Sequence, residues 1–253
     1  MVNLEVKCLT KKYNNKVILN NLNFEVYNNE FLSVLGPSGC GKTTLLKLLI
    51  GIEKPTSGKI IKNCKDITNI DASKRDMGIV FQNYALFPNM TALENVSYAL
   101  KNKLGNKSKA KDESIKMLTL LNMEEHLNKY PHELSGGQQQ RVAIARTLVL
   151  SPDVILFDEA MSALDADNRL HLRKELKDIQ KKFKTTIIYI THDQEEAFSL
   201  SDRVMILNKG IIEQIDKPNI VFNKPANEYV KRFVTDHLIE KVNSIEKCTG
   251  IDL

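Results

Sequence analysis

The sequence predicts an α/β fold with a phosphate-binding loop, an antiparallel β sheet near its N-terminus and an inserted α-helical segment. Three observations lead to this class. A glycine-rich loop stands between an apolar run and a helical segment, short apolar and β-branched runs recur along the chain, and one long segment has helical periodicity. At 253 residues the chain is long enough to bury a sizeable core in one large domain or in a core with an insert.

Composition narrows the classes of protein. The four cysteines are scattered without a C-x-x-C pair, which speaks against a zinc site and a disulfide framework and favours a reducing cytoplasm. No apolar run approaches the roughly eighteen residues of a membrane helix, and the N-terminus lacks a signal-peptide pattern, so we expect that the chain alone does not cross a bilayer. The net charge of +5 is mild and only 6% of residues are aromatic, which disfavours nucleic-acid binding.

Residues 2–27 alternate between apolar and polar side chains, with asparagine-rich turns between the runs, and this pattern predicts antiparallel strands at a sheet edge. Tyr13 lies in the predicted turn at 12–15, ahead of the glycine-rich loop. Its ring can stack on a purine base, or it is an ordinary exposed turn residue. The sequence leaves these two interpretations open.

The glycine-rich stretch 36–44 matches the phosphate-loop pattern G-x-x-x-x-G-K-[ST]. The apolar run 31–35 before it is predicted to be a strand, and residues 45–50 after it are predicted to be a helix, which is the order that the motif requires. The alternative, a glycine-rich turn beside an exposed lysine, would not require this order. Glycines let backbone N–H groups surround an anion, and the helix N-terminus adds its positive dipole end. We expect Lys42 to meet the β- and γ-phosphates of a nucleotide and Thr43 to offer its hydroxyl to Mg²⁺. The residues of this predicted nucleotide site are Gly36, Pro37, Ser38, Gly39, Cys40, Gly41, Lys42, Thr43 and Thr44.

Polar side chains follow three further predicted strands, at 77–81, 154–157 and 185–190. These side chains are Gln82, Asp158, Glu159 and His192. Ligands of open α/β sheets bind at the carboxyl ends of the strands, so we expect them at one edge. Gln82 and Asp158 carry oxygen atoms suited to Mg²⁺, and Glu159 is placed to polarise a water molecule. Each is also compatible with an ordinary polar residue at a strand end.

A helical pattern extends from residue 91 to about 129, with a polar linker predicted over 102–112. A further helix starts at Ser135, a good N-cap, and runs to Leu150. The two glycines after Ser135 let backbone N–H groups approach an anion, so this helix start is a second candidate phosphate-binding surface. The loop at 83–88 is predicted to expose aromatic and apolar side chains, which is typical of a binding surface.

Together these stretches resemble an ABC-transporter ATPase subunit. The resemblance covers residues 1 to about 235 and rests on the phosphate loop, Gln82, the signature Leu-Ser-Gly-Gly-Gln at 134–138, the strand end at 154–159, the segment 162–165 and His192. It implies the ABC ATPase fold, a RecA-like P-loop core with an antiparallel β subdomain and an inserted α-helical subdomain. The implied boundaries are 1–87 and 152–235 for the core, about 88–151 for the helical subdomain and 236–253 for a short helical tail.

The resemblance also implies a role for each site residue. In that family two copies associate head to tail, and each ATP lies between one phosphate loop and the signature of the other copy. Tyr13 then stacks on adenine, Glu159 is the catalytic base and His192 contacts the γ-phosphate. Catalysis further depends on Lys42 and Gln82, and the ligands of Mg²⁺ are Thr43, Gln82 and Asp158. The implied contacts across the dimer are Ser135, Gly136, Gly137, Gln138 and Asp165.

Residues 81–88 and 191–197 resemble importer ATPases for polyamines, ferric iron, phosphonates, sulfate or sugars. This implies ATP hydrolysis coupled to uptake of a small charged nutrient, at the cytoplasmic face of the cell membrane. The implied partners are a second copy of the chain, a membrane permease that docks near Tyr84, Leu86 and Phe87, and indirectly an extracytoplasmic solute-binding protein. Many such importers carry a further β-rich regulatory domain, which we expect to be absent here, where only a helix over 227–242 is predicted.

Two other classes of protein share part of this pattern. A soluble ABC ATPase that acts on nucleic acid or the ribosome would need a long coiled coil between phosphate loop and signature, or two cassettes in one chain, and the sequence contains neither. A small-molecule kinase would share the phosphate loop, but it gives no reason for the signature or for His192. The importer ATPase is therefore the favoured interpretation.

Overall fold

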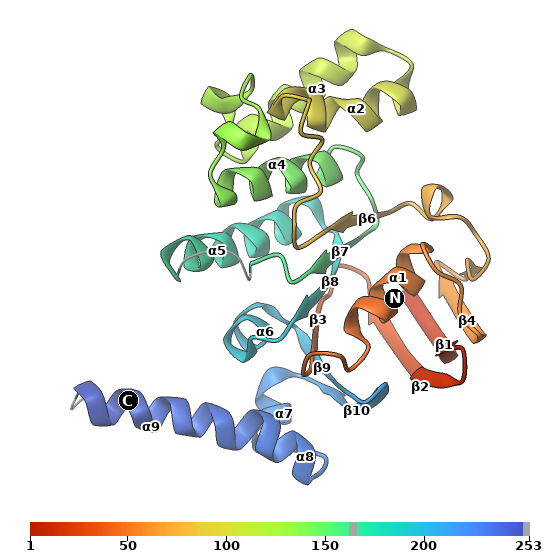
Figure 1. Ribbon diagram of the computed structural model, residues 1–253, viewed down its shortest axis with the longest axis vertical. Helices are drawn as coiled ribbons and strands as arrows, with labels where there is room; N and C mark the ends of the chain where they lie inside the picture. Colours follow the sequence, from red (N-terminus) through yellow and green to blue (C-terminus); the bar gives the residue numbers. More distant parts are fainter. Residues whose placement is uncertain (162–165, 250–253) are drawn as a thin grey trace. The chain divides into compact units, whose positions relative to one another are not determined.

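The structure is a computed structural model that describes residues 1–161 and 166–249. It divides into two units, one made of Met1–Asp71 and Ile188–Leu253 and the other of Ala72–Ile187 (Figure 1). They are called unit 1 and unit 2 below. No helix in the described part of the chain is both long and apolar enough to cross a membrane.

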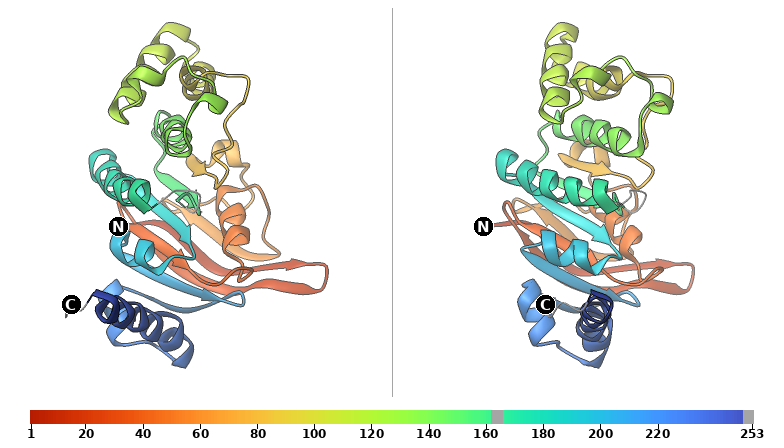
Figure 2. Two further views of the ribbon diagram at one scale, coloured as in Figure 1. Left: turned by 60° about the vertical axis from the view of Figure 1, so that its left-hand side comes forward. Right: turned by 90° about the vertical axis from the view of Figure 1, so that its left-hand side faces the viewer.

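Unit 1 contains the antiparallel sheet that the alternating N-terminal residues predict. Its strands lie in the order β2-β1-β4-β5, with β1 at Val2–Tyr13, β2 at Lys16–Tyr27, β4 at Ser57–Lys62 and β5 at Lys65–Asp66. β1 and β2 form a long hairpin, in which Leu4 pairs with Val26 and Tyr13 with Lys16 (Figure 2). Tyr13 is therefore the last residue of a strand rather than part of the turn, because the turn contains Asn14 and Asn15 alone.

The second sheet of unit 1 carries the phosphate loop. Its strands in this unit lie in the order β10-β9-β3-β8, with β3 at Phe31–Leu35, β9 at Arg203–Asn208 and β10 at Ile211–Asp216. β8 is at Thr186–Thr191, and its residues from Ile188 onward belong to unit 1. β3 pairs in parallel with β9, and all five of its residues are buried, as expected of a central strand. Helix α1 (Lys42–Ile50) follows β3, and α6 (Gln194–Leu200) follows β8. Both strands therefore end where a functional residue was predicted.

The C-terminal part of unit 1 is helical. It consists of α7 (Pro218–Asn223), α8 (Glu228–Val230), a π-helical turn (Lys231–Asp236) and α9 (His237–Thr249). Val221, Val230 and Val234 pack in one buried cluster with Val204 and Ile206 of β9. The apolar face of this segment is thus fixed on the sheet. The predicted helix over 227–242 falls within it.

Unit 2 contains the helical segment. β6 (Met77–Val80) pairs in parallel with β7 (Val154–Asp158), and the helices are α2 (Ala92–Leu104), α3 (Lys107–Leu120), α4 (Gly136–Leu148) and α5 (Ala166–Phe183). Short 3₁₀ turns lie at Ala72–Lys74, Glu124–His126 and Pro131–Glu133.

The prediction of a polar linker over 102–112 is wrong. Only two residues separate α2 from α3, because Gly105 takes a left-handed C-cap conformation and the Asn106 carboxamide accepts a hydrogen bond from the amide of Lys109 at 3.0 Å. Polar residues in this stretch form the solvent-facing turns of two capped helices. α4 begins after Ser135 as predicted and ends at Leu148, two residues before the predicted end.

Candidate nucleotide-binding site

The phosphate loop leaves β3 at Gly36, where only glycine fits. A Cβ atom there would lie 2.2 Å from the carbonyl oxygen of Leu207 and 2.8 Å from the Cys40 sulfur. Gly41, just before α1, has a φ of 110° in the left-handed region, and a Cβ there would lie 2.6 Å from the side chain of Leu19. The loop is therefore pressed against neighbouring strands on one side.

The other side of the loop is open. Ser38, Gly39 and Thr43 are exposed, and a Cβ on Gly39 would meet nothing within 4 Å. Lys42, by contrast, is only 5% exposed, and its ammonium donates hydrogen bonds to the carbonyl oxygens of Gly36 at 2.7 Å and Pro37 at 3.0 Å. A cation held against an open loop at a helix N-terminus fits a phosphate group well.

Tyr13 is 42% exposed, and its hydroxyl donates a hydrogen bond to the carboxylate of Glu53. The ammonium of Lys11 lies 4.7 Å from the centre of the Tyr13 ring and 3.2 Å from the Glu53 carboxylate. Partial burial and the bond to Glu53 raise the pKa of Tyr13, while that bond and Lys11 lower the pKa of Glu53. One face of the ring thus carries a lysine, and a base that stacks on Tyr13 would use the other face or displace Lys11.

His192 follows the last residue of β8 and is exposed. Thr191 donates from its hydroxyl to the carboxylate of the buried Glu196 at 2.7 Å, and the amide of Asp193 donates to the Thr191 hydroxyl at 2.9 Å. The Asp193 carboxylate in turn caps α6 by accepting from the amide of Glu196 at 3.2 Å. The backbone is thus fixed on both sides of the imidazole.

The segment after β8 also contacts the C-terminal helices, which the sequence pattern does not predict. Gln194 is buried, donates to the carbonyl oxygen of Phe233, and places its Oε1 atom 2.7 Å from Nδ1 of His237. His192, Arg232 and Lys241 join these residues around a small cavity of about 340 Å³. Gln194 is the first residue of α6, three positions after the end of β8, and its burial, which requires a hydrogen-bond partner, is visible only in the folded chain.

Unit 2 holds the other predicted site residues at the ends of its strands. Gln82 is exposed and lies in a turn that the amide of Tyr84 closes by donating to the carbonyl oxygen of Phe81 at 2.9 Å. Asp158 is the last residue of β7 and is half-buried. Glu159 follows with a φ of 46°, a left-handed conformation that is strained in a residue other than glycine. The chain therefore turns sharply at the two adjacent carboxylates.

The signature segment forms a capped helix start. The Ser135 hydroxyl accepts from the amide of Gln138 at 3.3 Å, and the Gln138 side chain accepts from the amide of Ser135 at 2.9 Å. This reciprocal pair satisfies two donors of the first turn. Leu134 is buried, whereas Gly136 is exposed and a Cβ on Gly137 would meet nothing within 4 Å. The backbone at the two glycines is thus open to a ligand.

The prediction that Tyr84 is exposed is wrong. Its side chain is 7% exposed, burial raises the pKa of its hydroxyl, and its φ is 60°. Leu86 is half-buried, and Phe87 is 41% exposed. The physical reason is the backbone, since consecutive left-handed residues Tyr84 and Ala85 reverse the direction of the chain and turn the tyrosine inward.

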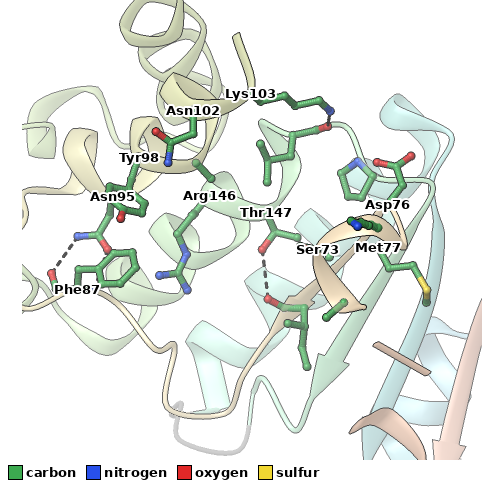
Figure 3. Close-up of a pocket in the computed structure, with 17 residues that line it drawn as sticks. Ser73, Asp76, Met77, Phe87, Asn95, Tyr98, Asn102, Lys103, Arg146 and Thr147 are labelled. Atoms are coloured by element: carbon green, nitrogen blue, oxygen red, sulfur yellow. Dashed lines mark hydrogen bonds between the residues drawn. The ribbon is translucent and has the colours of Figure 1, made fainter. Parts of the chain in front are cut away.

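Beside this loop, unit 2 contains a groove of about 780 Å³ (Figure 3). Phe87 from the loop, Asn95 and Tyr98 from α2, and Arg146 and Thr147 from α4 contribute to its lining. The Phe87 and Tyr98 rings lie 5.2 Å apart in a tilted arrangement. The groove combines aromatic surface with polar side chains, as binding sites for peptide segments do.

The predicted site residues therefore fall into two sets. Unit 1 contains the phosphate loop, Tyr13 and His192, and unit 2 contains Gln82, the signature segment, Asp158 and Glu159. Asp165, with the rest of the segment 162–165, lies outside the described residues.

Comparisons with known proteins agree with these motifs. Residues 19–162 match the family model described as ABC transporter. The chain is similar to the spermidine/putrescine import ATP-binding protein PotA of Aggregatibacter actinomycetemcomitans, with 44% identity over 96% of this chain and 66% of the relative. It is also similar to the PotA protein of Pasteurella multocida, with 46% identity over 91% of this chain and 62% of the relative. A third relative is the Fe(3+) ions import ATP-binding protein FbpC of Fusobacterium nucleatum, with 42% identity over 98% of this chain and 68% of the relative. The chain thus spans between 62% and 68% of the length of these curated relatives.

Two solved structures are similar in fold. One is a dimeric ATP-binding cassette in a post-hydrolysis state with ADP and phosphate, at 33% identity and a TM-score of 0.76 over 85% of this chain and 98% of that one. The other is cbiO1 of Clostridium perfringens, part of the complex cbiONQ, at 30% identity and a TM-score of 0.82 over 99% of both chains. This likeness confirms the predicted fold class.

Proposed function

Because the chain belongs to the ABC transporter family, we propose that it is the ATP-hydrolysing subunit of an importer, which couples ATP binding, dimerisation and hydrolysis to solute uptake through a separate membrane permease. The observation that carries this proposal is the phosphate loop, in which the buried Lys42 ammonium is hydrogen-bonded to the carbonyl oxygen of Gly36 and the backbone at Gly39 is open. Relatives named as import ATP-binding proteins support the direction of transport.

In this proposal the residues of unit 1 hold the nucleotide. Lys42 balances the charge of the β- and γ-phosphates, and the loop amides and the N-terminus of α1 bind their oxygen atoms. Tyr13 stacks on the adenine through the face that Lys11 does not cover. His192 contacts the γ-phosphate from a backbone that Thr191 and Asp193 fix.

The residues that would hold Mg²⁺ are Thr43, Gln82 and Asp158. Hydroxyl, amide and carboxylate oxygens are the ligands that this hard cation prefers, so the residues present fit the ion. When bound at these residues, the ion would supply positive charge that stabilises the negative charge developing on the phosphate groups during transfer. Glu159 orients the attacking water and accepts its proton, while the bond between the γ-phosphorus and the bridging oxygen breaks to give ADP and phosphate.

The second half of each site comes from a second copy of the chain. Ser135, Gly136, Gly137 and Gln138 present an open, capped helix start to the nucleotide of the other copy. We propose a head-to-tail dimer, with Asp165 as a contact between the copies. The dimeric cassette with ADP and phosphate supports this arrangement for a similar protein.

We place the permease contact at the groove of unit 2. Phe87 and Tyr98 are exposed aromatic residues of its lining, at 41% and 46%. Leu86 is half-buried next to Phe87 in the loop, and Tyr84 is buried. The chain then acts at the cytoplasmic face of the cell membrane as a peripheral subunit, and an extracytoplasmic solute-binding protein is an indirect partner. No nucleic acid takes part. The proposed solute is a small charged nutrient such as a polyamine, ferric iron or a phosphonate, and the named relatives support the first two.

The domain boundaries predicted from the sequence are part of the proposal. Residues 1–235 form the ATPase domain, with the RecA-like core at 1–87 and 152–235 and the helical subdomain at about 88–151. Residues 236–253 form the C-terminal tail. The position of α2, α3 and α4 within residues 88–151 supports the middle boundary.

Recovery of the tagged chain from detergent-solubilised membranes tests the proposal. The parental chain should recover a multi-span permease, and the F87A variant should lose it. Tyr27→Ala is the matched control, because Tyr27 is equally exposed, at 41%, and lies in unit 1. Recovery of ribosomes or DNA without a permease would favour the soluble class instead.

A further inference from the structure

We infer that Arg146 of the signature helix α4 is a positioning residue for Gln82, because it holds the backbone of the loop that carries this glutamine. The inference deepens the proposed function and rests on it, since Gln82 is assigned its role there. Arg146 itself does not touch the nucleotide in this scheme. It acts through the loop at 82–87.

The guanidinium of Arg146 holds two successive carbonyl groups. Its Nη2 atom donates to the oxygen of Tyr84 at 3.0 Å, and its Nη1 atom donates to the oxygen of Ala85 at 2.7 Å. Both residues are left-handed, with φ values of 60° and 46°. Residues other than glycine avoid this conformation unless their surroundings impose it. Charge-assisted bonds to both carbonyls supply such a constraint.

The far end of the same loop is held by Asn95 of α2. The Asn95 side chain accepts from the amide of Phe87 at 2.8 Å and donates to its carbonyl oxygen at 3.1 Å (Figure 3). The Phe87 ring lies 5.6 Å from the guanidinium carbon of Arg146. Burial lowers the pKa of Arg146, yet a guanidinium stays charged in proteins. The loop is thus clamped between α4 and α2, and its conformation is fixed by side chains on both helices.

Tyr84 connects this clamp to Gln82. Its amide closes the turn over Gln82 and Asn83 by donating to Phe81, and its carbonyl group is the one that Arg146 holds. Displacing the Tyr84 carbonyl would therefore open the turn at Gln82. Arg146 also belongs to the helix that starts at Gly136, so the position of Gln82 is defined relative to the signature segment.

Arginine is required at this position by geometry. Its planar fork reaches two carbonyls at once, whereas a lysine ammonium is a point charge on a flexible chain. Arg146→Lys keeps the positive charge but cannot hold both the Tyr84 and the Ala85 carbonyl groups in the same geometry. A role that depended on charge alone would survive this change.

A double-mutant cycle with steady-state ATP hydrolysis tests the inference. The proteins are the full-length parent, Q82A, R146K and the double variant, and both kcat and KM for Mg-ATP are measured. We expect R146K to lower kcat about tenfold with little change in KM, and to lower it less than twofold in the Q82A background, because residues that act as a unit are not additive. Equal fold losses in both backgrounds, or a change in KM alone, would overturn the inference.

Two further measurements separate positioning from folding. Amide hydrogen exchange at Tyr84 should be faster in R146K, with unchanged exchange in α3, and Lys116→Met serves as a control because Lys116 is an exposed cation of α3 paired with Glu113 at 2.8 Å. If R146K does not fold, R146Q takes its place. Faster exchange at Tyr84 together with additive effects of Q82A and R146K on kcat would show that Arg146 has only a structural role. A parental chain without ATPase activity would overturn the proposed function, whereas an active parent with an additive cycle overturns this inference alone.

Discussion

Nδ1 of His237 lies 2.7 Å from Oε1 of Gln194, so the first residue of α9 contacts a residue two positions after His192. The amide oxygen can only accept, and Nδ1 therefore carries the proton in this contact. The amide nitrogen of Gln194 donates to the carbonyl oxygen of Phe233 in the preceding π-helical turn. A single buried side chain thus joins the C-terminal helices to the segment after β8.

This contact predicts a graded loss of stability. His237→Ala removes one hydrogen bond and should lower the free energy of unfolding by about 1 kcal/mol, whereas Gln194→Ala removes both and should cost about 2 kcal/mol. Urea unfolding measures the two values. His171→Ala is the control, because His171 is an exposed residue of α5, and this variant should stay within about 0.5 kcal/mol of the parent. Equal stability of H237A and the parent would show that the contact contributes nothing.

The glycines of the phosphate loop predict a contrast between two alanine variants. Gly36→Ala places a methyl group 2.2 Å from a backbone oxygen, which cannot withdraw as a flexible side chain does, so we expect a loss of about 3 kcal/mol. Gly39→Ala meets no atom and bears only the strain of a φ of 78°, so about 1 kcal/mol is expected. Thermal unfolding of both variants checks that G36A loses more stability than G39A. A larger loss in G39A would show that the close contact with Leu207 is not the reason for glycine at position 36.

The sequence predicts strand ends well, because apolar runs such as 154–157 are local signals and the polar residues after them must lie at the sheet edge. It does not show which side chains turn inward. Tyr84 is buried although it and Ala85 have left-handed backbone conformations and neither is a glycine. Cys40 is only 4% exposed because the phosphate loop packs on Leu207. The burial of both side chains depends on tertiary contacts.

The partners that hold the site in place lie far along the chain. Arg146 contacts residues about sixty positions away, and Gln194 contacts His237 across forty-three. No local pattern predicts such pairs. A signal was nevertheless present, because Asn95 and Arg146 are polar residues within otherwise apolar helix faces, and buried polar groups need partners. The position of Glu53, in the segment after α1, beside Tyr13 of β1 is likewise visible only in the folded chain.

Replacing Glu159 by glutamine should separate binding from turnover. The amide keeps the size of the side chain but cannot accept the proton of the attacking water, so kcat should fall by about a hundredfold or more while ATP affinity is retained. Measurements of ATP hydrolysis and of nucleotide binding check both parts. Glu124→Gln is the control, since Glu124 is an exposed carboxylate of a 3₁₀ turn in unit 2. Parental turnover in E159Q would exclude Glu159 as the base.

The bond between Tyr13 and Glu53 predicts an acid-sensitive contribution to stability. The hydrogen bond from Tyr13, followed by the contacts with Lys11, lowers the pKa of Glu53 below its ordinary value of 4.5. A carboxyl group with a lowered pKa in the folded state stabilises the fold above its unfolded pKa, and this contribution is lost as the pH falls through the folded value. We therefore expect the parent to lose stability below about pH 4.5 more steeply than Tyr13→Phe, which lacks the hydroxyl.

The same variant separates the two roles of Tyr13. The phenylalanine ring keeps its aromatic face, so Tyr13→Phe should bind ATP nearly as well as the parent at neutral pH, whereas Tyr13→Ala should bind it more weakly because base stacking contributes about 1–3 kcal/mol. Urea unfolding between pH 3 and 7 and a binding titration with ATP make both comparisons. Parallel pH profiles for Y13F and the parent would show that the hydroxyl does not set the pKa of Glu53. Equal affinities of Y13A and the parent would remove Tyr13 from the adenine site.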